Sequence, residues 1–133
     1  MKRPRSLALL TIALLVSSCG TGARNLQSAL SVCSSNSSAY AEVYIPDATV
    51  VRVLGERAGR SGEHEGFVIR ANGQTFRVED NVGITGPIPL QRGNVVSLLG
   101  QLECDDDVIH WTHHDPSGRH QSGYIKVNGT LYE

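Results

Sequence analysis

The sequence predicts an all-β domain, a small OB-like closed barrel with a short N-terminal helix and a C-terminal β-hairpin. Segments rich in β-branched residues follow one another beyond Tyr40, and no long helical pattern interrupts them. Two Asn-Gly pairs, Asn72-Gly73 and Asn128-Gly129, are the strongest short-range signals for tight hairpins. Five main strands with a long first strand fit a barrel. A β-sandwich is the alternative, although about seven short strands rarely fill two sheets in so short a chain.

The N-terminal residues predict a signal peptide. Three of the first five residues are basic, and the apolar run Leu7–Val16 is too short to span about 30 Å of hydrocarbon. The run and the following Ser-Ser-Cys19 resemble a bacterial lipoprotein signal, which implies cleavage before Cys19 and a lipid on its sulfur. Gly20 in the next position then implies the outer membrane, on the side that faces the periplasm. An ordinary secretory signal is the alternative.

Three regions follow from this interpretation: a signal peptide at 1–18, a lipidated tether with a short helix at 19–42, and the barrel domain at 43–133. Removal of the signal leaves 133 − 18 = 115 residues, enough for one modest domain. Its 9 basic residues (12 − 3) face 13 acidic ones. This negative balance and an aromatic content of 5% argue against a nucleic-acid partner. We expect a monomer attached to the membrane by its lipid, and no protein partner is implied.

Two cysteines, Cys33 and Cys104, remain after Cys19 is lipidated. Disulfides persist in exported domains, so we expect these two residues to form a bridge. Two buried free thiols are the alternative.

The first element expected is a helix of two to three turns. Leu26, Ala29, Leu30 and Cys33 recur at the spacing of one helix face, and the polar stretch 34–38 ends the pattern. Because Cys33 lies on the apolar face, a bridge to Cys104 would clamp this helix to the barrel.

The first three strands are predicted around one long segment and one hairpin. Val43–Leu54 reads as a long first strand, in which Pro46 indicates an edge or a bulge. The Asn72-Gly73 turn sets the register of the next two strands. It pairs Ile69 with Phe76 and Phe67 with Val78.

The later strands are bounded by polar turns. Val95–Cys104 is expected as the fourth strand and Val108–His113 as the fifth, with the aspartate triplet 105–107 between them. The triplet lacks the alternating spacing and the closing glutamate of a calcium loop. A small terminal hairpin is expected from Gly123–Val127 and Thr130–Tyr132.

The segment Ile109–His120 holds four of the five histidines and the single tryptophan. Imidazole is the usual side chain for proton transfer near neutral pH and the commonest metal ligand. If Asp115–Gly118 forms a tight turn, His113 lies opposite His120 with Cβ atoms about 5 Å apart. Two imidazoles so placed can share a divalent metal ion. By strand alternation, His110 would face the other way.

A purely structural interpretation of the same residues is the alternative. In it, Ile109 and Trp111 fill the barrel and His113 is a buried, hydrogen-bonded core residue. Asp115 then locks the turn with no ligand involved. His64, flanked by charge and glycine, would be a surface residue.

One set of residues, spread over about Val50 to Tyr132, forms a recognisable pattern: Val51–Leu54, His64, Gly73–Thr75, Asn81, Leu90–Val96, Ile109–Pro116, Gly118–His120, Gly123 and Gly129–Tyr132. In this pattern the chain resembles a family of small exported bacterial proteins of unknown function. The resemblance implies an OB-like fold and no established activity. It also nominates His64, Asp80 and Asn81 beside the histidine segment. Glu65 stands where the family has Gln, and Asp80 where it often has His.

The leading hypothesis is a binding module that holds a divalent metal, zinc or copper, or a small polar ligand. The candidate metal ligands are His113, His120, His64 and Asp80. The candidate ligand-binding residues are Trp111, His114, Asp115 and Asn81. Alternatives are a metal-dependent hydrolase that uses a zinc-activated water, and a lipoprotein with structural interactions only.

No catalytic residue is assigned, because no serine or cysteine nucleophile stands out. A weaker likeness to HNH-type nucleases conflicts with the acidic charge and with the short chain after His120, which has no room for the helix those sites need.

Overall fold

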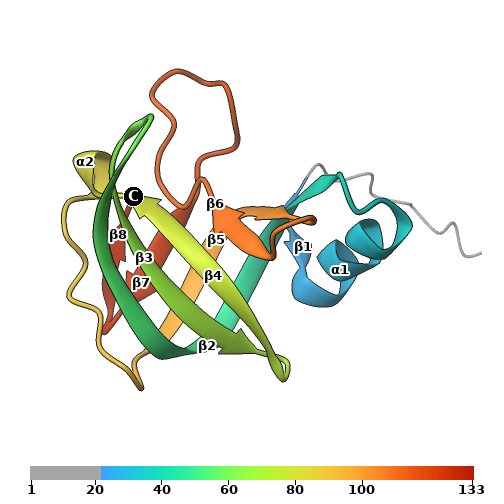
Figure 1. Cartoon of the computed structure of the whole chain (residues 1–133), viewed down its shortest axis with the longest axis horizontal. Helices are drawn as coiled ribbons and strands as arrows, with labels where there is room; N and C mark the ends of the chain where they lie inside the picture. The colour runs from blue at the N-terminus through green and yellow to red at the C-terminus, as the bar shows by residue number, and fades with distance from the viewer. Residues whose placement is uncertain (1–21) are drawn as a thin grey trace, which may run out of the picture.

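The computed structural model describes residues 22–133 and shows a mostly β domain, which confirms the predicted all-β class (Figure 1). Its eight strands form one sheet in the order β1-β2-β3-β4-β6-β5-β7-β8, and β2 also pairs with β5. The pairings therefore lead from β2 through β3, β4, β6 and β5 back to β2, so these five strands form a partial ring. The elements are β1 (Arg24–Asn25), α1 (Leu26–Ser35), β2 (Tyr40–Gly59), β3 (Gly62–Ala71), β4 (Gln74–Asn81), α2 (Val82–Thr85), β5 (Val95–Glu103), β6 (Val108–His110), β7 (Tyr124–Val127) and β8 (Thr130–Tyr132).

Helix α1 forms where the apolar spacing predicts it. Asn25 caps its first turn, because the side-chain Oδ1 accepts a hydrogen bond from the Ser28 amide at 2.9 Å. Leu26 and Ala29 face inward and belong to the hydrophobic core. Within residues 22–133, no helix is both long enough and apolar enough to cross a membrane.

The predicted disulfide is present. Cys33 on α1 is bonded to Cys104, directly after β5, with the two Cα atoms 5.0 Å apart. The bridge closes a sequence separation of 71 residues. The bridge therefore fastens α1 to the end of β5, as the position of Cys33 on the apolar face of the helix predicts.

Strand β2 is longer than predicted and serves two neighbours. Its first part pairs with β5 and its second part with β3, so it bends around the core. Pro46 lies where the β2–β5 register shifts between Ile45 and Ala48. The proline therefore occupies a bulge, as expected for a residue that cannot donate to the ladder.

The two Asn-Gly turns form the predicted hairpins. Asn72 and Gly73 have φ of 49° and 78°, as a type I′ turn requires, and the register pairs Ile69 with Phe76. Asn128 and Gly129, with φ of 52° and 81°, close the β7–β8 hairpin in the same way.

The core lies inside the partial ring and continues under α1. Inward-facing positions of every long strand contribute to it, which explains why buried and half-buried residues alternate along most of β5. Its largest fully buried side chains are Phe67, Phe76, Ile45, Ile69, Leu98, Leu102, Ile109 and Ile125.

Strand β6 ends three residues earlier than predicted. Trp111 has φ of 56°, in the left-handed region, and this conformation breaks the strand after His110. The prediction that Trp111 fills the barrel is wrong, because its side chain is 41% exposed. Thr112, with no exposure, is buried instead.

Candidate functional site

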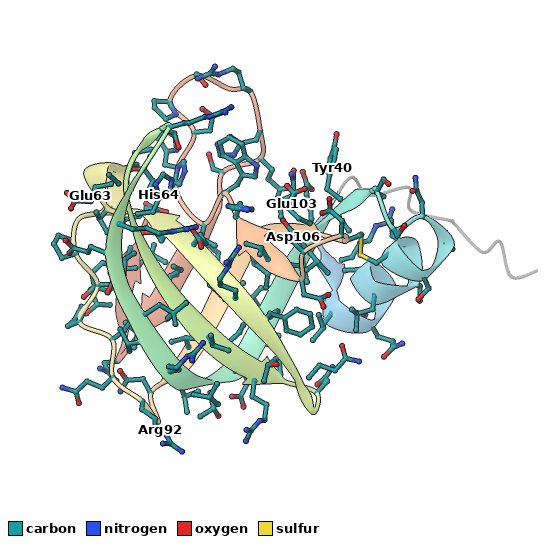
Figure 2. The ribbon with its side chains drawn as sticks, viewed as in Figure 1. Tyr40, Glu63, His64, Arg92, Glu103 and Asp106 are labelled. Carbon is teal, nitrogen blue, oxygen red and sulfur yellow. A yellow bond between two sulfur atoms is a disulfide. The ribbon has the colours of Figure 1, made fainter. Side chains whose placement is uncertain are left out.

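A hollow of about 1030 Å³ opens at one end of the sheet, where the β6–β7 loop rises beside the tip of the β2–β3 hairpin (Figure 1). Its wall is built from the ends of β2, β3, β4, β5 and β6 and from this loop. Figure 2 shows His64 on one side of this end and Tyr40 with Glu103 on the other. We call it the histidine hollow, because it is lined by His64, His110, His113 and His120.

The left-handed turn at Trp111 is held by two glycines. A Cβ on Gly123 would collide with the carbonyl oxygens of Trp111 and Leu99. A Cβ on Gly100 would lie 2.7 Å from the His110 carbonyl oxygen. The chain after β6 therefore crosses the sheet at a distance that only glycine permits. This crossing turns Trp111 outward to the histidine hollow.

His113 and His120 face each other within the loop. Their ring centroids lie 5.3 Å apart at an interplanar angle of 84°, and the Trp111 ring lies 4.1 Å from His120. Nδ1 of His113 lies 2.8 Å from the His114 carbonyl oxygen, and Nδ1 of His120 lies 2.7 Å from that of Gln121. A carbonyl oxygen only accepts, so each Nδ1 carries a proton, and in the neutral form of each ring Nε2 then has the free lone pair. The two rings lie close together as predicted, but not as the predicted opposed hairpin pair, because the His113 carbonyl accepts its hydrogen bond from the Gly123 amide.

Asp115 organises the loop. Its Oδ1 accepts hydrogen bonds from the amide and hydroxyl of Ser117 at 2.8 and 2.5 Å, and its Oδ2 accepts from the His120 amide at 2.7 Å. These donors stabilise the ionised carboxylate and hold the pKa of Asp115 well below its usual range. The Ser117 hydroxyl has the largest effect. The Gly118 amide also donates to the Asp115 carbonyl at 3.3 Å, which closes the predicted turn. Asp115 lines the hollow, but both of its carboxylate oxygens already accept hydrogen bonds from residues of the same loop.

Asp80 does not line the histidine hollow. It has no solvent exposure and accepts hydrogen bonds from the hydroxyls of Thr85 at 2.5 Å and Thr112 at 2.8 Å. Burial raises the pKa of Asp80, although both hydroxyls act in the opposite direction. Asp80 thus ties helix α2 and the residue after Trp111 to β4.

His64 and Asn81 lie opposite each other on β3 and β4 and shape the rim. The Asn81 side chain donates to the Ser61 carbonyl at 3.0 Å and accepts from the Gly83 amide at 3.0 Å. His64 Nδ1 lies 3.0 Å from the Gly62 carbonyl oxygen, and its Nε2 lies 3.2 Å from the Ser61 hydroxyl. Both residues line the hollow as nominated, but their polar atoms mainly hold the β2–β3 turn.

His110 is the residue that sequence reasoning misplaced. Strand alternation places His110 and His113 on opposite faces, yet both line the histidine hollow. The left-handed Trp111 between them cancels the alternation. Burial lowers the pKa of His110, because it disfavours the charged ring. No local sequence signal marks Trp111 for this conformation.

His114 is exposed and lies outside the lining of the hollow. Its Nδ1 lies 3.2 Å from the Ser122 hydroxyl. It is therefore the one histidine of the described residues that does not line the histidine hollow.

Sequence reasoning missed the charged part of the lining. Glu79, which is 5% exposed, pairs with Arg57 at 2.5 Å and with Arg77 at 3.2 Å. Glu103 accepts a hydrogen bond from the Gln101 amide at 3.0 Å. Glu79 directly precedes Asp80 near the end of β4. Its position next to a candidate metal ligand was therefore the one sequence feature that could have identified it.

The described part of the chain, residues 22–133, contains no group of three or more His, Cys, Asp or Glu side chains placed to hold one metal ion. The predicted three-ligand site is therefore not assembled. Asp80 is turned away into the interior, and His64 is engaged by the turn that precedes it.

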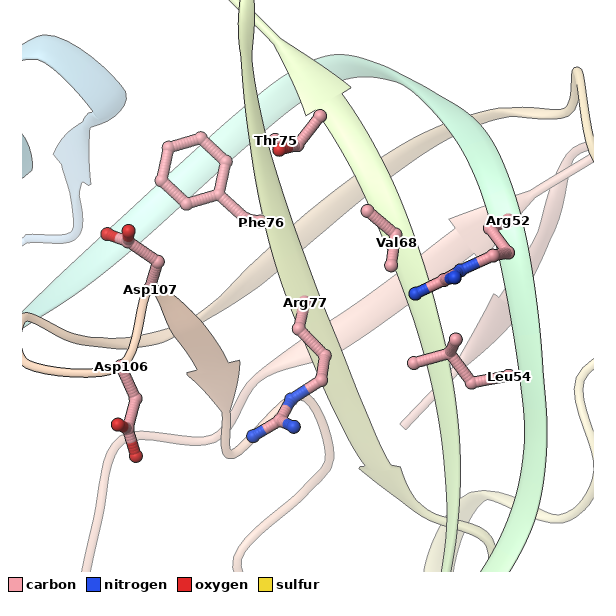
Figure 3. Close-up of a pocket in the computed structure, with 8 residues that line it drawn as sticks. All are labelled: Arg52, Leu54, Val68, Thr75, Phe76, Arg77, Asp106 and Asp107. Carbon is pink, nitrogen blue, oxygen red and sulfur yellow. The ribbon is translucent and has the colours of Figure 1, made fainter.

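A second hollow of about 420 Å³ lies on the outer face of β2, β3 and β4 (Figure 3). Arg52 and Leu54 of β2 stand on one side of it and Asp106 and Asp107 on the other, with Arg77 between them. All its charged side chains are exposed, and Phe76 beneath them belongs to the core. This outer hollow holds no histidine.

No curated protein and no solved structure matches the chain. A family described as "Protein of unknown function (DUF3465)" matches residues 12–133, which is nearly the whole chain. The chain belongs to this DUF3465 family.

Proposed function

We propose that this protein is an OB-like binding module whose histidine hollow takes up a small polar ligand. The strand order β2-β3-β4-β6-β5 with a return to β2, and the parallel β4–β6 pair, support the OB-like barrel. OB-folds bind their ligands on one face of the barrel and in the loops beside it. The histidine hollow lies at this kind of place, between the β2–β3 turn and the strand ends.

A single observation carries the binding function. Histidines from three separate segments, His64 on β3, His110 on β6, and His113 with His120 in the loop, line one hollow beside Trp111. Nδ1 of His113 and of His120 is occupied by a main-chain carbonyl, so both rings present an Nε2 acceptor. The ligand class that fits is small and rich in hydrogen-bond donors.

A structural role is the second candidate, and a specific observation favours it. The polar atoms of Asp115, Asn81 and Asp80 are all hydrogen-bonded within the chain. The hydrolase alternative has less support, because a zinc-activated water needs a metal held by about three protein ligands.

Trp111 makes the test direct, because it is the only tryptophan of the chain. The full chain is titrated with a panel of amino acids, polyamines and monosaccharides, and ligand binding is followed by Trp111 fluorescence and by the NMR signals of the loop. We expect one class to shift the signals of Trp111, His113 and His120, but not those of Val68 in the outer hollow. His113→Ala should weaken that binding about tenfold or more, while the exposed control His114→Ala should not. Shifts confined to the outer hollow would contradict the proposal.

We also propose export and attachment of the chain to the periplasmic face of the outer membrane. Cys19 lies outside the described residues, so the proposal depends on the sequence pattern and on the Cys33–Cys104 bridge, which suits an exported domain. Cys19→Ser should release the protein from the membrane fraction. Retention of this variant in membranes would refute the lipid anchor.

A further inference from the structure

We infer that His113 and His120 form a two-histidine site for one zinc(II) or copper(II) ion, with open coordination positions that face the histidine hollow. This inference rests on the proposed function, because it places a metal ion at the site where the polar ligand would enter. The ion would be held through Nε2 of both rings. Water, or a ligand atom that offers a lone pair to the ion, would complete its coordination.

The tautomers suit metal binding. Ligating histidines almost always donate their other ring N–H to a carbonyl, a carboxylate or water, which fixes the ring and leaves the second nitrogen free. Nδ1 of His113 and of His120 makes such a contact with a main-chain carbonyl, at 2.8 and 2.7 Å. His114 differs, because its Nδ1 faces the Ser122 hydroxyl instead.

The spacing of the two rings also suits one shared ion. Two imidazoles that ligate a tetrahedral zinc ion through bonds of about 2.0–2.1 Å have ring centroids about 5 Å apart. The centroids of His113 and His120 are 5.3 Å apart and their planes are nearly perpendicular.

The pair is held in place before any ion arrives. His113 is 6% exposed, and its carbonyl accepts a hydrogen bond from the Gly123 amide at 2.8 Å. The His120 amide is fixed by Asp115 Oδ2, and the Trp111 ring packs on the imidazole. The same carboxylate oxygen lies 3.8 Å from His120 Nε2, so its negative charge compensates a bound cation.

The donor set selects the metal. Imidazole nitrogens suit zinc and copper, whereas magnesium and calcium prefer oxygen ligands. Two protein ligands leave at least two positions open on a four-coordinate ion. Such a site binds more weakly than a closed structural site and exchanges its remaining ligands.

The first experiment uses the full chain without an affinity tag and measures binding of zinc sulfate, copper sulfate and magnesium sulfate by calorimetry. We expect one zinc or copper ion per chain and no magnesium. His113→Ala and His120→Ala should each lower the affinity at least about tenfold, while the matched control His114→Ala should leave it unchanged within about twofold. Circular dichroism without metal verifies that each variant is folded.

The second experiment needs no variant. Long-range ¹H–¹⁵N NMR reports each imidazole nitrogen, and zinc should shift Nε2 of His113 and His120 while His114 stays in place. Copper should quench Trp111, whose ring contacts His120. Absence of stoichiometric zinc or copper, or shifts at His64 or His114 in place of the pair, would overturn the inference. A polar ligand that still shifts Trp111 would then leave the proposed function standing, whereas no response to metal or to ligand would remove both.

Discussion

The strand framework and the β6–β7 loop hold their side chains by different means. In the framework, side-chain position follows from strand pairing: Phe67 and Ile69 are buried because their register with β4 places them on the inner face. In the loop, position follows from side-chain contacts with the main chain, centred on Asp115, and from one left-handed residue, Trp111. Burial of apolar area stabilises the framework, whereas hydrogen bonds and close backbone packing shape the loop.

Two carboxylates show the same contrast. Asp80 is buried under the framework, and burial raises its pKa in spite of two hydroxyl donors. Asp115 accepts main-chain and hydroxyl hydrogen bonds in the loop, and these lower its pKa. A buried framework carboxylate therefore opposes folding when it ionises, while the loop carboxylate favours folding only when it is ionised. The histidine hollow lies between these two environments.

The largest expected change in stability tests whether the β6–β7 loop can cross the sheet only where a glycine lies. Gly123→Ala places a Cβ against the carbonyl oxygens of Trp111 and Leu99, and Leu99 is held in the ladder of β5. We expect a loss of at least about 3 kcal/mol in the free energy of unfolding, measured with denaturant. Gly22→Ala is the control, because nothing lies within 4 Å of its Cβ. Equal stability of the two variants would show that the loop can rearrange.

The next effect tests how far the framework depends on its N-terminal clamp. The Cys33→Ala and Cys104→Ala double variant removes a bridge between residues 71 positions apart. We expect a loss of about 2–3 kcal/mol, because the unfolded chain gains freedom and α1 is no longer fastened to β5. Thermal unfolding followed by circular dichroism measures it. Trp111 fluorescence should keep its native value below the transition, and an altered native spectrum would mean that the clamp also shapes the hollow.

The smallest effect compares the two carboxylates by their pH dependence. The raised pKa of Asp80 means that its contribution to stability is present at low pH and is lost as pH rises from about 4 through the raised value. Asp80→Asn should remove this decline. The lowered pKa of Asp115 means the reverse: its contribution is present above about 4 and is lost as pH falls. Asp115→Asn should abolish the low-pH loss.

Unfolding curves at intervals between pH 2 and pH 7 separate the two carboxylates, and Trp111 fluorescence reports the loop independently. Each variant should flatten a different part of the wild-type profile. Identical profiles for both variants would contradict the assignment of opposite pKa shifts to framework and loop.

Local patterns in the sequence were sufficient for most of the framework. Residue types and spacing predict four of its features: the Asn72-Gly73 turn, the bulge at Pro46, the apolar face of α1 and the Cys33–Cys104 bridge. The first three depend on neighbours close in the chain, and the bridge joins the two cysteines that remain after the predicted lipidation of Cys19. The approach of His113 and His120 was also predictable from the turn residues between them.

Contacts between segments distant in the chain determine which face the histidines occupy and what else surrounds them. Trp111 is left-handed because the chain must cross Gly100 and Gly123, residues distant in sequence, and this reversal brings His110 into the hollow. Asp80 lies outside the histidine hollow because of another contact between distant segments. Thr112 and Thr85 reach its carboxylate only when the loop and α2 fold over β4. Sequence patterns record local periodicity, whereas close packing between distant segments sets where a strand ends and which side chains meet.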